Sequence, residues 1–481
     1  MKKNDFAIWQ MLIKKELLVV YRNKTMLIST VMIWMLFIAA TICTWLDYQS
    51  GHKQRVEANA LFRQQWEHQQ RNPHDAAHFG TYLFKSINLL NVFDTGLDDY
   101  AGNTYRIEAH VQHEPDAANA LGNDGSMRFG RLTLALILQL LIPLLLLFIT
   151  ATSITTEKEQ GTLKMLLAQG LSTSRLIWVK AISSYLFIVA VVLPIFLLMI
   201  FVLLIFPETT VLLARLLWVM FAFLLYFLFI ALLGTLISAW SGHSGKALLT
   251  ALSCWILMSI ISPKLLTGIA DRSYLPMSRA AFTDLVEQGY RNGLNGDDPY
   301  AARGERFVRN MLKKYHANTV SELPFNIEGL TFQYHEDYRT MMFNHYLAQV
   351  AQQFNKQQNF LKIAGIFNPF LSIKRISMSL SGTDYYHHQY FFKQAQTYRN
   401  HLIKTLNEQL AMHSKGVNGE YTLGPHYFAQ LNKFDDQLPP IHKVIKLNEI
   451  AFCAIAGWIL LLTVLLQFIA SRSLARHYEP A

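Results

Sequence analysis

Long apolar runs alternate with polar stretches along the chain, and six of the runs are long enough to cross a membrane. A helix of about 20 apolar residues spans the hydrocarbon core of a bilayer, and these runs contain few or no charges. The predicted spans cover residues 25–46, 132–154, 182–206, 216–239, 247–270 and 450–470. The pattern predicts a mainly α, polytopic membrane protein.

Two long polar regions, residues 47–131 and 271–445, interrupt the series of spans. We expect them to form two α-rich outer domains with some strand, because periodic segments alternate there with Gly, Pro and Asn. A helix is predicted at 54–70 and a strand at 105–112 in the first region. Helices are predicted at 277–290, 300–315, 332–361 and 390–413 in the second.

Basic residues set the predicted orientation. The short segments between spans that would face inward contain Lys158, Lys164 and Lys246, whereas the short turn at 207–210 contains no basic residue. The tail at 471–481 is also basic. We therefore expect a multi-pass protein of the bacterial inner membrane with both termini in the cytoplasm.

Residues 1–24 are predicted to form an amphipathic helix on the inner membrane surface, in contact with membrane lipids. Its apolar residues recur at helical spacing among lysines and arginines. They are Phe6, Trp9, Ile13, Leu17 and Val20. A cytoplasmic helix packed on a partner is the alternative, and the two are compatible.

Composition supports the membrane class. Of 481 residues, 52% are hydrophobic and only 16% are charged, which is too apolar for an ordinary soluble enzyme. The net charge of +10 lies largely beside the spans, so membrane orientation explains it better than nucleic-acid binding. Cys43, Cys254 and Cys453 all fall in predicted spans, so no disulfide framework is expected.

The segment at 155–180, between the second and third spans, has the pattern of a coupling element. Glu157 and Glu159 are followed by the helix break Gly161-Thr162, and Leu163 and Leu166 then lie three residues apart. This spacing predicts a short amphipathic helix with an apolar face suited to a groove on a partner. A solvated cytoplasmic turn is the alternative interpretation.

The string Glu157-Lys-Glu-Gln-Gly-Thr-Leu-Lys-Met-Leu-Leu, continued to Lys180, resembles the corresponding loop of ABC-2 type transporter permeases. The chain departs from the family pattern at Gln169-Gly170, where a pair containing Pro is common. Large outer regions are also unusual in that family. The resemblance implies a permease subunit, with a second permease chain, identical or paralogous, and a separate ATPase that binds ATP and magnesium. It implies export of a hydrophobic or amphipathic substrate, or work on an outer partner.

The resemblance also implies which residues couple the permease to the ATPase. They are Glu157, Glu159, Gly161, Thr162, Leu163 and Leu166. The stretch from Ser241 to Ala247 superficially matches a nucleotide-binding loop but lacks its first Gly and its final Ser or Thr. We therefore expect no cofactor and no ATPase activity in this chain.

Two histidines, His74 and His78, stand one helical turn apart in the first polar region. A zinc peptidase would require Glu where Asp75 stands, so a membrane metallopeptidase is an alternative with weaker support. His110, His113 and Glu108 could complete a metal site, although nothing in the sequence places them nearby. We expect these histidines to be hydrogen-bonded in an outer domain. A membrane scaffold that recruits partners through its outer domains is a third hypothesis.

Overall fold

The computed structural model describes residues 3–113, 132–205, 210–417 and 419–472. This part of the chain contains six helices that are long and apolar enough to cross a membrane, which confirms the predicted fold class. In order, the spans lie in α2 (Lys24–Glu67), α6–η2–α7–α8 (Leu134–Glu159), α10 (Thr173–Ile205), α11 (Thr210–Trp240), α12–η4–α13 (Ser244–Ser273) and α20 (Ile441–Arg472). Within the two interrupted spans, the α-helical parts are α6 (Leu134–Leu136), α7 (Ile142–Thr152), α12 (Ser244–Ile256) and α13 (Ser262–Ser273). They are preceded by α1 (Lys3–Arg22).

Helix α2 extends well beyond the first predicted span. It has 44 residues, and at 1.5 Å per residue its length is about 66 Å, roughly twice the thickness of the hydrocarbon core. The side chain of Asn23 caps its start by accepting bonds from the backbone N–H groups of Thr25 and Met26. The polar continuation of the same helix therefore brings the chain directly into the first long polar region. The two long polar regions, 47–131 and 271–445, together form the outer region.

Two spans contain a wide π turn just before a proline. In η2 (Ile137–Leu141) and η4 (Leu257–Ile261), the central residue is four positions before Pro143 or Pro263. A proline ring clashes with the carbonyl at that position, and the wider turn relieves the clash. Side chains from other elements bind carbonyls in both turns. Trp255 Nε1 donates to Leu140 O at 3.2 Å, and Asn368 Nδ2 donates to Met258 O at 2.8 Å.

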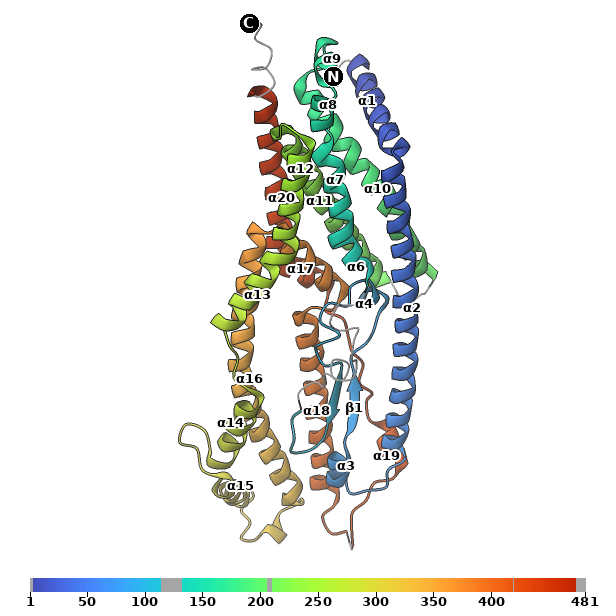
Figure 1. Ribbon diagram of the computed structural model, residues 1–481. Coiled ribbons are helices and arrows are strands. Elements are labelled where there is room, and N and C mark those ends of the chain that lie inside the picture. Colours follow the sequence, from blue (N-terminus) through green and yellow to red (C-terminus); the bar gives the residue numbers. More distant parts are fainter. Residues whose placement is uncertain (1–2, 114–131, 206–209, 418, 473–481) are drawn as a thin grey trace.

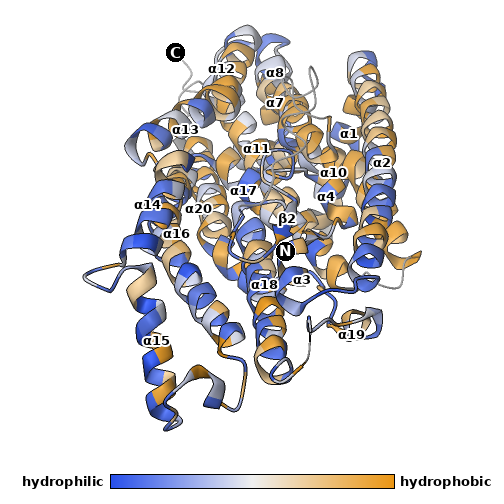
Figure 2. Cartoon of the chain, turned by 90° about the horizontal axis from the view of Figure 1, so that it is seen from below, coloured by the Kyte–Doolittle hydropathy of each residue, from blue (hydrophilic) through white to orange (hydrophobic). Residues whose placement is uncertain are grey.

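Different elements form the two ends of the molecule. Figure 1 shows α8, α9, the start of α1 and the end of α20 at one end, and α3, α15 and α19 at the other. Figure 2 shows that α14 and α15 are largely hydrophilic. The candidate spans thus lie toward the first end, and the hydrophilic helices α14 and α15 lie toward the second.

Both long polar regions contribute to the second end of the molecule. The first contains α3 (Pro73–Phe79), β1 (Thr81–Phe84), α4 (Leu89–Phe93) and β2 (Thr104–Ile107), with β1 and β2 paired antiparallel. The second contains α14 (Arg279–Asn292), α15 (Tyr300–Lys314), η5 (Val320–Glu322), α16 (Ile327–Phe367), α17 (Pro369–Ser381), α18 (Tyr385–His413) and α19 (Pro425–Gln430).

The two polar regions share one hydrophobic core, although the sequence predicts two outer domains. Trp66, Leu83 and Tyr105 of the first region pack in the same cluster as Phe343 and Phe392 of the second. The rings of Tyr105 and Phe392 meet edge to face, with 5.5 Å between their centroids. Neither region alone supplies all sides of this core.

Helix α17 packs with the spans rather than in the core shared by the two polar regions (the outer core). Ile373, Ile376 and Leu380 are buried in the same cluster as residues of α7, α10 and α11. The sequence assigns all of 271–445 to an outer domain and predicts no helix at 369–381. Helix α17 has only 13 residues and is apolar along one face, so it is too short to be recognised as a span.

Three predicted features lie partly or wholly outside the described residues. They are the return of the first polar region to the bilayer, which includes 114–131, the turn at 207–210, and most of the tail at 471–481.

Candidate functional site

The candidate coupling segment forms two short helices, α8 (Thr155–Glu159) and α9 (Thr162–Ala168), at the end of the bundle near α1 (Figure 1). The helix break predicted from the sequence is at Gly161, which has a φ of 73°. This left-handed conformation is costly for residues with a Cβ atom, so glycine suits the position.

Glu157 does not face outward as a free carboxylate. Its Oε1 atom lies 2.7 Å from Nζ of Lys180 on α10, and Lys180 also lies 2.8 Å from Oε2 of Glu16 on α1. Thr162, at the start of α9, donates a hydrogen bond to the other carboxylate oxygen of Glu157. The exposed fractions of the Glu157, Lys180 and Glu16 side chains are 13%, 7% and 10%. This largely buried network ties α8 to α1, α9 and α10.

The other charged residues of α8 contact the connection between α11 and α12. Lys158 Nζ donates to the carbonyls of Ala239 and Ser241, both at 2.8 Å, at the C-terminal end of α11, where a cation is favoured. Glu159 accepts bonds from the backbone N–H and the hydroxyl of Ser244, both at 2.7 Å. These bonds connect α8 to the end of α11 and to the start of α12.

The apolar residues of α9 differ in exposure. Leu163 is only 8% exposed, so the chain itself already covers it, and Leu166 is partly buried. Met165 is 62% exposed and presents the most accessible large apolar side chain of this helix. An apolar groove on a partner would therefore meet Met165 and Leu166 first.

Sequence reasoning missed Glu16, Ser244 and Met165 as parts of this segment. Glu16 and Ser244 lie far from Glu157 in the sequence, and no motif links either of them to it. The signal available for Glu16 is that it is one of only two acidic residues, with Asp5, in a predicted helix at 1–24 that has six basic residues.

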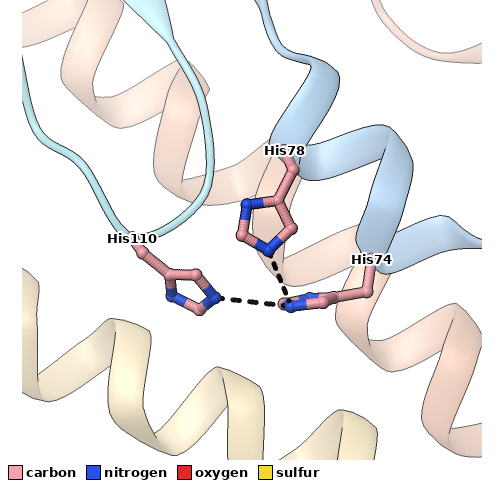
Figure 3. Close-up of side chains that lie close together, drawn as sticks. All are labelled: His74, His78 and His110. Atoms are coloured by element: carbon pink, nitrogen blue, oxygen red, sulfur yellow. Dashed lines mark hydrogen bonds between the residues drawn. The ribbon is translucent and has the colours of Figure 1, made fainter.

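A second candidate site is formed by histidines in the outer region. His74 and His78 lie on α3, and His110 lies on the loop that follows β2. Figure 3 shows the three rings turned toward one another. His74 Nε2 is 3.2 Å from His78 Nε2 and 3.3 Å from His110 Nε2. Burial is the main cause that lowers the pKa of His74 and of His78, which favours neutral imidazoles.

Residues of the second polar region support this cluster. Asn407 of α18 binds His74, and Glu336 of α16 lies 2.7 Å from Nδ1 of His110. His113 and Glu108, the other metal-ligand candidates, pair with each other at 2.6 Å. The metal-ligand candidates thus divide into a three-histidine cluster and a separate pair formed by His113 and Glu108.

The structure also connects a span to the outer region through a buried cation. Arg215 of α11 is 1% exposed, and its guanidinium lies 3.0 Å from His387 Nε2 and donates to Pro439 O at 2.6 Å. Nδ1 of His387 in turn lies 2.5 Å from a carboxylate oxygen of Asp384. These contacts join α11 directly to the first turn of α18.

Comparison with known proteins identifies the family. A family model described as ABC-2 family transporter protein matches residues 10–300, more than half of the chain. A domain of unknown function (DUF3526) matches residues 279–436, most of the second polar region. No match is found among curated proteins or among solved structures. The family resemblance is thus confirmed, and the chain belongs to the ABC-2 family of transporter proteins.

Proposed function

We propose that the chain is the permease subunit of an ABC exporter and that α8 and α9 receive the movement of a separate ATPase subunit. The observation that carries the proposal is that α8, while lying at the end of the bundle, is bonded to α10, α11 and the start of α12, and through Lys180 of α10 to α1. Permeases of this family work with an ABC ATPase partner.

Coupling requires a contact between α9 and the ATPase, and a rigid connection from α8 and α9 to the spans. Met165 and Leu166 on α9 would enter an apolar groove on the ATPase, with Glu159 at its rim. Glu157, Gly161, Thr162 and Leu163 would hold α8 and α9 at a fixed angle to the spans. A push on α9 would then reach α10 through the contact between Glu157 and Lys180.

The outer end supports work beyond the membrane. Because Arg215 joins α11 to His387 at the start of α18, and α18 contributes Phe391 and Phe392 to the outer core, a shift of this span would move α18 and its contacts in the outer core. We take the work to be export of a hydrophobic or amphipathic substrate, or movement of an outer partner. The assembly would contain a second permease chain, identical or paralogous, with all termini in the cytoplasm of a bacterial cell.

Co-purification tests the docking surface. The chain with Met165→Asp, purified from native membranes in mild detergent, should lose an ABC ATPase that accompanies the wild type. Met412→Asp, which alters an exposed methionine of the outer region (54% exposed), should retain it. If neither preparation contains an ABC ATPase, or if both contain equal amounts, the proposed docking is wrong.

A further inference from the structure

We propose that His74, His78 and His110 form a binding site for a divalent transition-metal ion, with Zn²⁺ as the ion that fits best. The inference is independent of the transport function proposed above, because it concerns the outer region alone. Imidazole nitrogens are common ligands of zinc, copper and nickel, and a tetrahedral arrangement favours zinc.

The spacing of the rings agrees with such a site. Ligand nitrogens at 2.0–2.1 Å from a tetrahedral zinc ion stand about 3.3 Å apart. The Nε2 atom of His74 lies 3.2 Å from that of His78 and 3.3 Å from that of His110. One ion could therefore contact all three rings after small side-chain movements.

The hydrogen bonds around His74 fix which of its ring nitrogens has the proton. Gln333 donates to Asp337 at 2.7 Å, so its amide oxygen is left to accept from Asn407 at 3.1 Å. The amide oxygen of Asn407 then faces Nδ1 of His74 at 3.1 Å. Since an oxygen needs a donor, Nδ1 of His74 has the proton, and Nε2 offers a lone pair.

The same reasoning applies to His110. Its Nδ1 atom lies 2.7 Å from the carboxylate of Glu336, so a neutral ring has its proton there. Glu336 is itself held by Arg399 at 2.9 Å, and the side chains of both are nearly inaccessible. A carboxylate that orients a ligand histidine in this way is typical of zinc sites.

The consequence is that lone pairs on His74 and His110 face each other at 3.3 Å. Two lone pairs repel, and a cation between them removes the repulsion. The ring of His78, which is more exposed, would supply the third ligand and leave a fourth position accessible from solvent. All three ligands come from the first polar region, whereas their supporting residues come from α16 and α18. Metal binding should therefore stabilise the shared outer core.

Cobalt titration tests the site. The full chain, purified in detergent with an affinity tag that lacks histidine and stripped with EDTA, should bind one equivalent of Co²⁺. We expect the intense visible bands of tetrahedral cobalt, lost on addition of Zn²⁺. His74→Ala and His110→Ala should abolish the bands, and His401→Ala, which alters an exposed histidine of α18, should leave them unchanged.

A supporting-residue variant makes the test sharper. Asn407→Leu keeps all three ligands but removes the acceptor that orients His74, so it should weaken zinc affinity about 10- to 100-fold. The site is disproved if the wild type shows no tetrahedral bands at saturating Co²⁺. In that case, a proton shared by His74 and His110 would be the cation between their rings. His78→Ala changes a residue on the exposed side of α3, and its melting temperature shows whether the variant is folded. The site is also disproved if the folded variant gives wild-type bands.

Discussion

Nζ of Lys180 lies 2.7 Å from Oε1 of Glu157, within a family segment in which carboxylates would be expected to meet a partner. The same ammonium group bonds Glu16 at 2.8 Å, so one cation on α10 joins α1 and α8. The two acidic residues of α8 thus bind different elements. Glu157 binds Lys180 of α10, and the more exposed Glu159 binds Ser244 at the start of α12.

Glu157→Gln should destabilise the protein and weaken coupling, because Lys180 would lose one of its two carboxylate partners in a largely buried position. We expect a loss of about 2 kcal/mol, seen as a lower melting temperature of the detergent-purified chain. Glu305→Gln removes a carboxylate whose side chain is 71% exposed and should have little effect. Equal melting temperatures for the two variants would contradict the structural role of Glu157.

Gly161→Ala should cost about 1 kcal/mol, because alanine at a φ of 73° is strained. The matched control is Gly245→Ala, which lies within α12 and, like Gly161, has open space around its Cβ position. Alanine favours helix at that control position and should be neutral or stabilising. Melting temperatures check both, and ATPase stimulation should fall only for Gly161→Ala.

Gly234→Ala should disrupt the packing of α11 on α7. A Cβ atom at Gly234 would overlap the hydroxyl of Thr150, and close helix contacts in membranes depend on such small residues. We expect a strong loss of folded protein in a fluorescence-detected size-exclusion assay. Thr150→Ala in the same chain should restore part of it, while Gly457→Ala, which meets nothing within 4 Å, should be tolerated. Absence of any rescue would argue against this contact.

Acid should weaken the junction between the outer region and the bundle. Although burial opposes ionisation of Asp98, the charge of Lys85 at 2.6 Å and the hydrogen bond with His388 together prevail, and the pKa of Asp98 falls to about 2. Because its folded-state pKa is lowered from about 4, the stabilisation is complete above pH 4 and is lost as the pH falls toward 2. Melting temperatures between pH 5 and pH 2.5 should drop less steeply for Asp98→Asn than for the wild type. Asp284→Asn, at an exposed carboxylate, should follow the wild-type curve.

The spans could be predicted from the sequence because length and hydropathy alone define them. Gly161 as a helix break could also be predicted, since few other residues adopt its conformation. In the outer region, α14, α15, α16 and α18 could be predicted from apolar residues at helical spacing and from the Gly, Pro and Asn residues between them.

The contacts between distant segments could not be predicted in this way. His110 meets His74 only because the loop after β2 folds back onto α3, and Glu16 meets Lys180 only because α1 packs on α10. Helix α17 was missed because 13 residues are too few to indicate a span, although one face of it lies in the bundle. Long-range packing, rather than local pattern, determines each of these features.

Site-specific photocrosslinking from position 165 in native membranes tests the central claim most directly. A photoreactive amino acid in place of Met165 should give, on illumination, one major adduct with an ABC ATPase, identified by mass spectrometry. The same amino acid in place of Met412 should give none. Absence of an ATPase adduct at position 165, with the protein expressed and folded, would contradict the assignment of α8 and α9 as the coupling surface.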